Sequence, residues 1–447
     1  MQKPNHTPNK RTSRQRKFLV IITGAFRLQS GSLRYGFALV IAAFMMIGWN
    51  FNSSHLPAAS APDDWPQWRG PNRDGISKET GLLKSWPEGG PKVLWRVPSG
   101  EGYAGIVIAK GRGYTMYGQG GSEFVICFDP ANGKELWRFK ADALFGNDQG
   151  NGPRSTPVVD GDLVFALSGS GKLHALSAAE GKAAWSHDLR AEYGGKIPTW
   201  GVSTTPLVEG NLLIVDVGGK SGHSVMAFNK ANGSVVWKSE SDIPGYSAPI
   251  AITTNSVRQI LVFTGSGLVS VAPNDGKLFW RHDWETRYDV NAATPVFIPP
   301  DKIFISSGYG KGGALLQTQA GNGRATVREL WRVRDMANHF SSSVLLNNHL
   351  YGFDEGLLTC LDLATGKTKW QQRGFQKGSL LLADGHLIVL GEYGNLALVE
   401  ATPDGYKEKS SVQILKGKCW TMPTLANGRL YLRNQSEMLC LEVAGKN

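Results

Sequence analysis

The stretch NGKELW, residues 132–137, decides the fold, because its pattern recurs along the chain. In each copy, a Gly that ends a turn is followed four residues later by a Trp. The five copies are NGKELW (132–137), EGKAAW (180–185), NGSVVW (232–237), DGKLFW (275–280) and TGKTKW (365–370). Asn-Gly and Asp-Gly accept the positive φ that a tight hairpin between twisted strands requires. The repeat therefore predicts a series of hairpins, each with a Trp on the strand that leaves the turn.

The residues around these turns extend each hairpin into a larger unit. Runs such as VICFD (125–129) and LHALS (173–177) alternate apolar and polar residues, which is the period of a strand. A second marker, such as STP (155–157) or TTP (204–206), opens a further hairpin before each unit. Each unit thus has four strands and about 40–45 residues, as in a propeller blade.

Counting the units predicts how many blades the ring has. The Trp residues from Trp95 onward are 42, 48, 52, 43, 51 and 39 residues apart, and residues 92–443 divide into eight units of 44. The last unit, 419–443, lacks its Trp strand, whereas VLWRV (93–97) is a Trp strand without a unit. We therefore expect an all-β, eight-bladed β-propeller of four-stranded antiparallel blades, closed by the N-terminal strand.

Composition agrees with this fold and narrows the function. The chain has 447 residues with 55 Gly, 22 Pro and 14 Trp, which argues against disorder and against a helical bundle. The net charge of +11 is concentrated at the N-terminus, where residues 1–34 hold eight basic residues and no acid. The rest of the chain has 40 basic and 37 acidic residues, so it is nearly neutral and gives no indication of nucleic-acid binding.

The N-terminus has the pattern of an export signal. The basic stretch precedes thirteen apolar or small residues at 37–49, and ASA at 59–61 fits a small-x-small cleavage site. We expect residues 1–61 to be a signal peptide or a short membrane anchor, 62–91 a leader or linker, and 92–443 the propeller. The protein is then exported to the periplasm or cell envelope, with an N-terminus that contacts or anchors in the membrane.

The four cysteines do not predict a disulfide framework. Cys127, Cys360 and Cys440 occupy the same place in the repeated strand pattern, and equivalent positions in different blades are too far apart to bond. The interpretation is buried small hydrophobic residues. No C-x-x-C sequence is present, which excludes zinc ribbons and attached c-type haem.

The repeat resembles the pyrroloquinoline-quinone-like (PQQ-like) propeller family. That family includes quinoprotein alcohol dehydrogenases and the propeller subunit of the bacterial outer-membrane β-barrel assembly machinery, and the chain is BamB-like in this sense. The stretches WPQWRGPN (65–72), IPTWGVSTTPLVEG (197–210), RYDVNAATP (287–295) and SSGYGKGGALL (306–316) resemble exported planctomycete-type members. The resemblance spans roughly residues 65–443.

Candidate site residues lie just before the innermost strand of each blade, because these loops crowd the central funnel. Each is large and carries a polar or aromatic group. The residues are Tyr103, Arg154, Trp200, Tyr246, Asn291, Asn338 with His339, Lys377 and Trp420. They either form a ligand funnel with aromatic walls and two cations, or cap strand ends. An acidic cluster of Asp283, Glu285 and Asp289 is either a solvated loop or a cation site beside Asn291.

Two functions from different classes follow. The first is a non-catalytic exported propeller that acts as a binding or assembly scaffold, with an envelope protein or small ligand at the funnel. The second, implied by the resemblance, is an alcohol dehydrogenase with PQQ in the funnel and calcium beside it. The family pattern for that enzyme includes a vicinal Cys pair over the quinone, which this sequence lacks. We therefore expect the scaffold, with no catalytic residue assigned.

Overall fold

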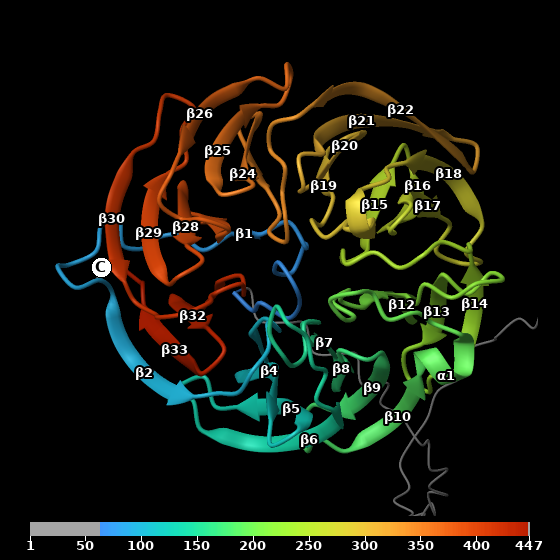
Figure 1. The fold of residues 1–447 in the computed structure, drawn as a ribbon, viewed down its shortest axis with the longest axis horizontal. Helices are drawn as coiled ribbons and strands as arrows, with labels where there is room; N and C mark the ends of the chain where they lie inside the picture. Colours follow the sequence, from blue (N-terminus) through green and yellow to red (C-terminus); the bar gives the residue numbers. More distant parts are fainter. Residues whose placement is uncertain (1–62, 446–447) are drawn as a thin grey trace, which may run out of the picture. The chain divides into compact units, whose positions relative to one another are not determined.

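A computed structural model describes residues 63–445, which form eight four-stranded antiparallel sheets arranged as blades around a central axis (Figure 1). This confirms the eight-bladed propeller. The expectations for residues 1–61 lie outside the described residues. Over 63–445, no helix has the length and apolar character needed to span a bilayer.

The first four blades follow one another along the chain, each running from its inner to its outer strand. Blade 1 consists of β3 (Val107–Ala109), β4 (Arg112–Gln119), β5 (Ser122–Phe128) and β6 (Glu135–Ala143). Blade 2 consists of β7 (Val158–Asp160), β8 (Leu163–Leu167), β9 (Lys172–Ser177) and β10 (Ala183–Asp188). Blade 3 consists of β11 (Leu207–Glu209), β12 (Leu212–Asp216), β13 (Val225–Asn229) and β14 (Val235–Ser239). Blade 4 consists of β15 (Ile250–Thr254), β16 (Val257–Phe263), β17 (Gly267–Val271) and β18 (Leu278–Asp283).

The remaining blades have the same order. Blade 5 consists of β19 (Val296–Ile298), β20 (Lys302–Ser307), β21 (Gly312–Gly321) and β22 (Arg324–Val333). Blade 6 consists of β23 (Val344–Leu346), β24 (His349–Asp354), β25 (Leu357–Asp362) and β26 (Thr368–Gln372). Blade 7 consists of β27 (Ser379–Ala383), β28 (His386–Leu390), β29 (Asn395–Glu400) and β30 (Glu408–Gln413). Two short helices, α1 (Leu189–Tyr193) and η1 (Arg287–Asp289), precede the inner strands of blades 3 and 5.

Blade 8 joins the two ends of the described chain. It combines β31 (Thr424–Ala426), β32 (Arg429–Arg433) and β33 (Glu437–Glu442) with β2 (Lys92–Pro98). Strand β2 pairs antiparallel with β33, and Trp95 lies opposite Cys440. The prediction that the N-terminal Trp strand closes the ring is therefore confirmed, and closure protects the outer edge that an incomplete blade would expose.

The repeated Trp and Gly fit together across the blade interfaces. Trp237 of blade 3 donates its indole N–H to the carbonyl of Pro273 in blade 4 at 2.7 Å. A Cβ atom on Gly276 would lie 2.4 Å from the Trp237 ring, so the Gly lets the two blades approach. Equivalent bonds join Trp95 to Pro130, Trp137 to Ala178, Trp185 to Lys230, Trp331 to Leu363 and Trp370 to Thr402. The motif therefore fixes how one blade packs on the next.

Two blades, 4 and 7, depart from this rule. The sequence departs from the repeat in blade 5, next to blade 4, where Gly323 and Trp331 are eight residues apart instead of four, and in blade 7, which has no Trp at this position. In blade 4, Trp280 bonds the Gln259 side chain of its own blade at 2.9 Å. Its neighbour, blade 5, has the long hairpin β21–β22 that accommodates the insertion before Trp331. In blade 7, Ser410 stands at the Trp position, and its hydroxyl accepts the backbone N–H of Trp86 at 2.7 Å.

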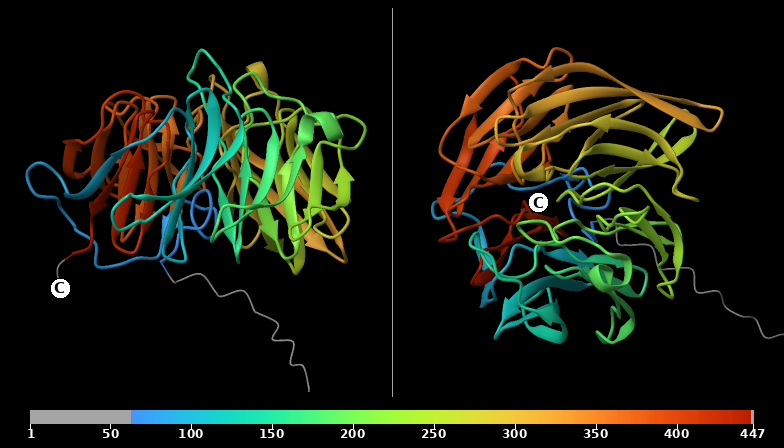
Figure 2. Two further views of the ribbon diagram at one scale, coloured as in Figure 1. Left: turned by 90° about the horizontal axis from the view of Figure 1, so that it is seen from below. Right: turned by 45° about the vertical axis from the view of Figure 1, so that its right-hand side comes forward.

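Residues 63–77, at the start of the described chain, cross the centre of the ring (blue in Figure 1). Here β1 (Ile76–Ser77) pairs in parallel with β27 of blade 7. The Arg73 guanidinium donates to the carbonyls of Thr205, at 3.3 Å, and Pro249, at 3.0 Å, in blades 3 and 4. The segment predicted only as a leader or linker is thus a plug across the channel. The side view places it in the lower half of the propeller, away from α1 (Figure 2).

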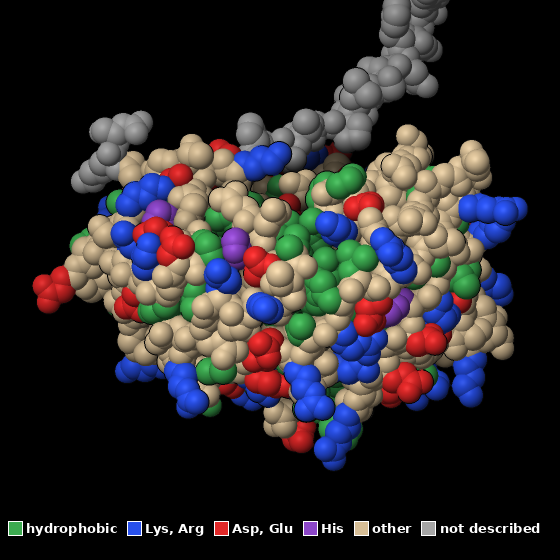
Figure 3. All heavy atoms as spheres, turned by 90° about the horizontal axis from the view of Figure 1, so that it is seen from above, with side chains coloured by type: hydrophobic (Ala, Val, Ile, Leu, Met, Phe, Trp, Pro, Cys, Tyr) green, Lys and Arg blue, Asp and Glu red, His purple; other side chains and the backbone are tan. Residues whose placement is uncertain are grey.

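The outer wall has no dominant charge on the face that Figure 3 shows. Lys and Arg side chains are interspersed there with Asp and Glu. Elsewhere on the surface, too, charged side chains of opposite sign pair, as Arg96 does with Glu437 at 2.5 Å and Arg332 with Glu329 at 2.7 Å. This mixed surface agrees with the nearly neutral charge of the chain after residue 34.

Candidate functional site

A cavity of about 670 Å³ opens at the end of the channel where the loops before the inner strands converge. The indole of Trp68, from the plug, contributes to its lining, so the plug closes the cavity from below. Most of the candidates predicted from the sequence meet here: Tyr103, Arg154, Trp200, Tyr246, His339, Lys377 and Trp420. The plug therefore turns the central channel into a blind pocket lined by loops from most of the blades.

Asn291 and Asn338 do not line this cavity, although they occupy the equivalent loop positions. Asn291 is fully buried and donates to the carbonyls of Thr264, at 2.8 Å, and Trp284, at 3.0 Å. Asn338 is also buried and donates to the Phe353 carbonyl at 2.8 Å. Because their amides satisfy loop carbonyls, both residues hold the loops together and do not face a ligand.

The aromatic side chains form a nearly continuous arc around the cavity. Adjacent ring centroids are 4.7 to 6.2 Å apart, within the range of favourable aromatic contacts. The order along the arc is Tyr103, Trp420, Phe340, His339, Tyr309, Tyr288, Trp200 and Tyr246. Tyr288 connects Tyr309 to Trp200 and is the one member of the arc that does not itself line the cavity. Such rigid, amphipathic surface is typical of recognition sites, because it loses little conformational entropy on binding.

Sequence reasoning missed several residues of this surface. Tyr309 and Tyr393 come from the hairpins β20–β21 and β28–β29, and they are 41% and 58% exposed. Comparing only the loops before the inner strands could not find them. Tyr309 does lie in the Gly-rich stretch 306–316, where an aromatic residue among glycines was an available signal.

Arg154 is held in place by its own loop. The guanidinium lies 4.8 Å from the ring centroid of Phe145 and 5.7 Å from that of Tyr103. It donates to the carbonyl of Gly150 at 2.6 Å and also to that of Gly152. Burial lowers the pKa of Arg154. Its role at the cavity is that of a fixed cation stacked between two rings.

Lys377 is a cation with a free ammonium group. Within residues 63–445 the structure gives this group no hydrogen bond or ion pair. By contrast, the Lys418 ammonium donates to the Gln149 carbonyl at 2.9 Å and lies 4.0 Å from the Trp420 ring centroid. Glu392 accepts the Trp420 indole N–H at 3.0 Å. With Arg154, the lining carries three cations and one carboxylate, so it favours an anionic group.

His339 contributes an unsatisfied polar atom to the wall. Its Nε2 is buried and has no hydrogen-bond partner in the described structure. Burial and the Lys377 ammonium lower the pKa of His339 to about 4, so the imidazole is neutral at pH 7. Leaving a buried polar atom without a partner costs free energy.

Buried carboxylates brace the loops that carry these residues. Glu123 accepts the backbone N–H groups of Phe145, at 3.2 Å, and Gly169, at 2.9 Å, and so positions the ring under Arg154. Asp216 accepts the N–H of Gly245, which precedes Tyr246, at 3.0 Å. Burial raises the pKa of Glu123 to about 7 and that of Asp216 to about 8.

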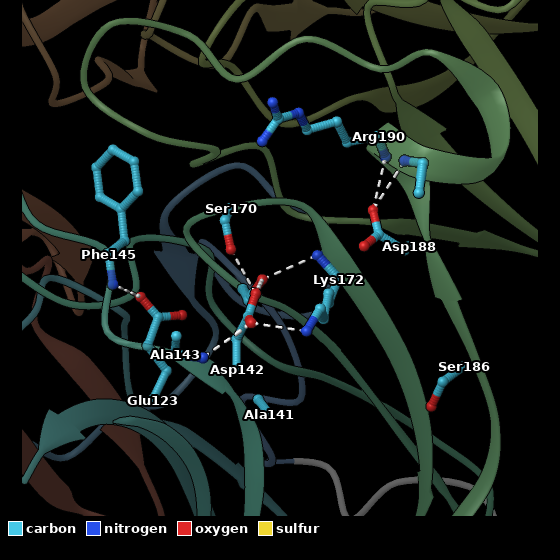
Figure 4. A network of polar contacts seen from close by, with 12 residues as sticks. Glu123, Ala141, Asp142, Ala143, Phe145, Ser170, Lys172, Ser186, Asp188 and Arg190 are labelled. Atoms are coloured by element: carbon cyan, nitrogen blue, oxygen red, sulfur yellow. Dashed lines mark hydrogen bonds and ion pairs between the residues drawn. The ribbon is translucent and has the colours of Figure 1, made fainter. Parts of the chain in front are cut away.

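A second carboxylate beside Glu123 completes this support (Figure 4). Asp142 accepts hydrogen bonds from Ser168, at 2.9 Å, and from Ser170, and it pairs with Lys172 at 2.9 Å. These contacts join blades 1 and 2 under the Arg154 loop. The hairpin 168–172 is therefore a structural contact between blades 1 and 2.

Acidic, His and Cys side chains do not cluster in the described part of the chain as a metal site would require. Between residues 63 and 445, no group of three or more His, Cys, Asp or Glu side chains could hold a metal ion. The acidic residues Asp283, Glu285 and Asp289 belong to no such group. The four cysteines are buried and free, and no two are adjacent in the sequence. The cavity thus supports binding by stacking and charge.

Comparison with known proteins identifies a family. A family model described as "Outer membrane protein assembly factor BamB" matches residues 87–164 and 121–372, more than half of the chain. The protein of that name from Moranella endobia (strain PCIT) is 22% identical over 283 residues, which are 60% of this chain and 69% of that protein.

Solved structures agree on the fold. BamB from Moraxella catarrhalis has a TM-score of 0.53 at 18% identity, covering 77% of this chain and 97% of that one. Quinohemoprotein alcohol dehydrogenase from Comamonas testosteroni has a TM-score of 0.57 at 12% identity, covering 86% of this chain and 81% of that one. Because an assembly factor and an enzyme both share the propeller, the fold does not select between their functions.

Proposed function

The chain belongs to the family described as outer membrane protein assembly factor BamB, and from this premise we propose that it is a non-catalytic binding scaffold of the cell envelope. The names of its relatives refer to outer-membrane protein assembly. Its N-terminal sequence has a basic stretch followed by a short apolar run, as in exported proteins. The scaffold thus acts outside the cytoplasm, on an envelope protein or a small ligand.

The proposal rests on the aromatic arc around the cavity of about 670 Å³, which we call the upper cavity. Aromatic residues and Arg are enriched where protein interfaces have their strongest contacts. Tyr309, in the arc, and Tyr393, a further residue of the lining, are about half exposed, so a partner reaches them without a change in the fold. The partner places an apolar or aromatic group between the rings and an acidic group near Lys377.

The dehydrogenase alternative has less support. Quinoprotein chemistry requires a redox cofactor in register with a base and a metal ion. PQQ would stack on Trp200 and Trp420 and place its carboxylates near Arg154 and Lys377. The described residues provide no metal-ligand group beside that position, and no vicinal cysteine pair occurs in the sequence. We therefore assign no reaction step to this cavity.

Site-specific photocrosslinking in cells tests the scaffold. A photoreactive residue at Tyr309, on the rim, should give a discrete adduct with an envelope protein. The same residue at Leu136, which is 48% exposed on outer strand β6, is the matched control and should not give that adduct. Combining the Tyr309 probe with Trp200→Ala and Lys377→Ala should remove the adduct.

A second assay addresses the enzyme alternative directly. Purified protein is incubated with PQQ and Ca²⁺, and alcohol-dependent dye reduction is measured. We expect none above the level without protein. Dye reduction that Arg154→Ala abolishes, or equal crosslinking from Tyr309 and Leu136, would refute the scaffold.

A further inference from the structure

The plug shows how an extended segment binds the inner edges of the blades. Strand β1 adds in parallel to the inner strand of blade 7, with Ile76 opposite Leu382. Trp65 forms an antiparallel bridge with Ile108 on the inner strand of blade 1. The N–H of Val159 in blade 2 donates to the Pro66 carbonyl at 2.8 Å. Backbone pairing thus covers the inner edges of blades 7, 1 and 2.

Blades 3 to 6 are not covered in this way. Their inner strands, β11, β15, β19 and β23, each pair with only one other strand. The plug reaches these blades through side chains, and it bonds residues that precede the strands. Trp68 donates to the Thr294 hydroxyl at 3.0 Å, and Arg69 donates to the Ser343 carbonyl at 2.7 Å. The strands themselves keep an unpaired backbone edge toward the channel.

These uncovered edges line a second cavity, of about 630 Å³, below the plug. Its apolar lining comes from both sides of β15, with Leu207 and Val208 from blade 3 and Val296 and Phe297 from blade 5. The charged residues at its rim are already paired, since Arg258 bonds Glu209 at 2.7 Å. Arg73 is likewise engaged with backbone carbonyls. Asp74, which also lines this cavity, accepts the backbone N–H of Ile76 at 3.0 Å. The lower cavity therefore combines apolar side chains and a backbone edge with charged groups that are already engaged.

The register of blade 4 shows which backbone groups are free. Strands β15 and β16 are joined by the two-residue turn 255–256, so Thr254 and Val257 form the closing pair. In such a hairpin the closing pair is hydrogen-bonded, and bonding alternates along the strand. The backbone N–H and C=O groups of Ile250, Ile252 and Thr254 therefore point toward β16. Ala251 presents its N–H and C=O to the channel, as Thr253 does.

We propose that the lower cavity binds an extended polypeptide segment of another protein, which adds as a strand to the inner edge of β15. Unpaired strand edges are templates for this pairing, and main-chain bonds supply affinity while pockets select alternate side chains. At five residues, β15 is the longest of the inner strands of blades 3 to 6. Since apolar side chains flank it, the segment alternates apolar and polar residues. This site is on the opposite side of the plug from the upper cavity and does not depend on it.

Fluorescence anisotropy on the full-length protein tests this site. The probe is a labelled peptide of alternating valine and threonine, flanked by lysines for solubility. We expect it to bind, and we expect a version with N-methylated valine and threonine amides to bind about tenfold more weakly or not at all, because it lacks the main-chain donors on both edges. If the unmodified peptide does not bind, or the methylated one binds equally, the proposal is wrong.

Variants then locate the binding. Ala251→Pro removes a donor that faces the channel, at an edge position where proline is tolerated. It should weaken peptide binding about tenfold, whereas Ala251→Thr, which keeps the N–H, should bind within about twofold of the wild type. Trp200→Ala in the upper cavity should leave peptide binding unchanged. Wild-type affinity in a folded Ala251→Pro protein would place the peptide elsewhere and overturn the proposal. If Ala251→Pro does not fold, the difference in affinity between the unmodified and the methylated peptide for the wild-type protein still tests the proposal.

Discussion

The blade interfaces and the loops of the upper cavity are built from the same repeat, but the repeated residues recur at the interfaces and vary in the loops. At the interfaces the same pair, Trp on one blade and Gly on the next, recurs with little change. At the cavity, the position before each inner strand holds a different residue in most blades, including Arg154, Trp200 and Lys377. Positions that keep the repeat are thus expected to carry stability, and positions that depart from it to carry recognition.

The largest expected effect is at an interface. Trp237→Ala should lower the free energy of unfolding by about 3–5 kcal/mol, because it empties a buried site between two blades and leaves the Pro273 carbonyl without its donor. Trp137→Ala should act in the same direction across the interface between blades 1 and 2. Urea unfolding followed by tryptophan fluorescence measures the change.

Leu136→Ala is the control for this prediction, because Leu136 is an apolar residue exposed on an outer strand. It should change stability by less than about 0.5 kcal/mol. If Trp237→Ala melts like Leu136→Ala, the interfaces do not carry the stability and the comparison fails.

The second effect concerns the plug. Arg73→Ala should cost roughly 2–3 kcal/mol, since it leaves the carbonyls of Thr205 and Pro249 without their donor. Arg73 is 3% exposed, and burial lowers its pKa to about 9. The cost of removing this cation from water therefore offsets part of the stability that its hydrogen bonds provide. Arg190→Ala, on exposed helix α1, is the matched control. If the two variants are equally stable, the contacts of Arg73 in the plug do not stabilise the propeller.

The fold could be predicted almost entirely from the sequence, because hairpin turns and interface Trp residues are local features of each repeat. The same logic found Arg154 and Trp200, which depart from the repeat at a fixed place. Asn291, chosen by the same logic, does not line the cavity, because whether a loop amide faces the cavity or its own backbone depends on contacts with Thr264 and Trp284. The plug was also missed, since nothing local in residues 65–77 indicates that they cross the ring.

A third prediction concerns the carboxylates that brace the cavity. The folded-state pKa of Asp216 is about 8, above its ordinary value of 3.8, because burial disfavours the charge. The folded state therefore holds a proton that the unfolded state loses, and stability falls as pH rises from about 4 to about 8. Glu123 adds a similar loss that ends near pH 7.

Asp216→Asn should remove the part of this loss that belongs to Asp216. Between pH 5 and pH 8 the wild type should lose at least ~1.4 kcal/mol more than the variant, the equivalent of one pKa unit. Urea unfolding at both pH values measures it, with exposed Asp275→Asn as the control. If both variants follow the wild-type pH dependence, Asp216 is ionised in the folded state and does not act in this way.

The smallest expected change in stability is at the cavity itself. Trp200→Ala should alter the free energy of unfolding by less than about 1 kcal/mol, because the indole is only partly buried and contacts the rings of Tyr246 and Tyr288 in the arc. The same variant should nevertheless lose the crosslinked adduct formed from Tyr309, since the partner then lacks one of its aromatic contacts. Urea unfolding and crosslinking on one preparation separate the two effects. A loss of stability as large as that of Trp237→Ala would show that the arc is part of the framework, and the division between interface and recognition residues would not hold.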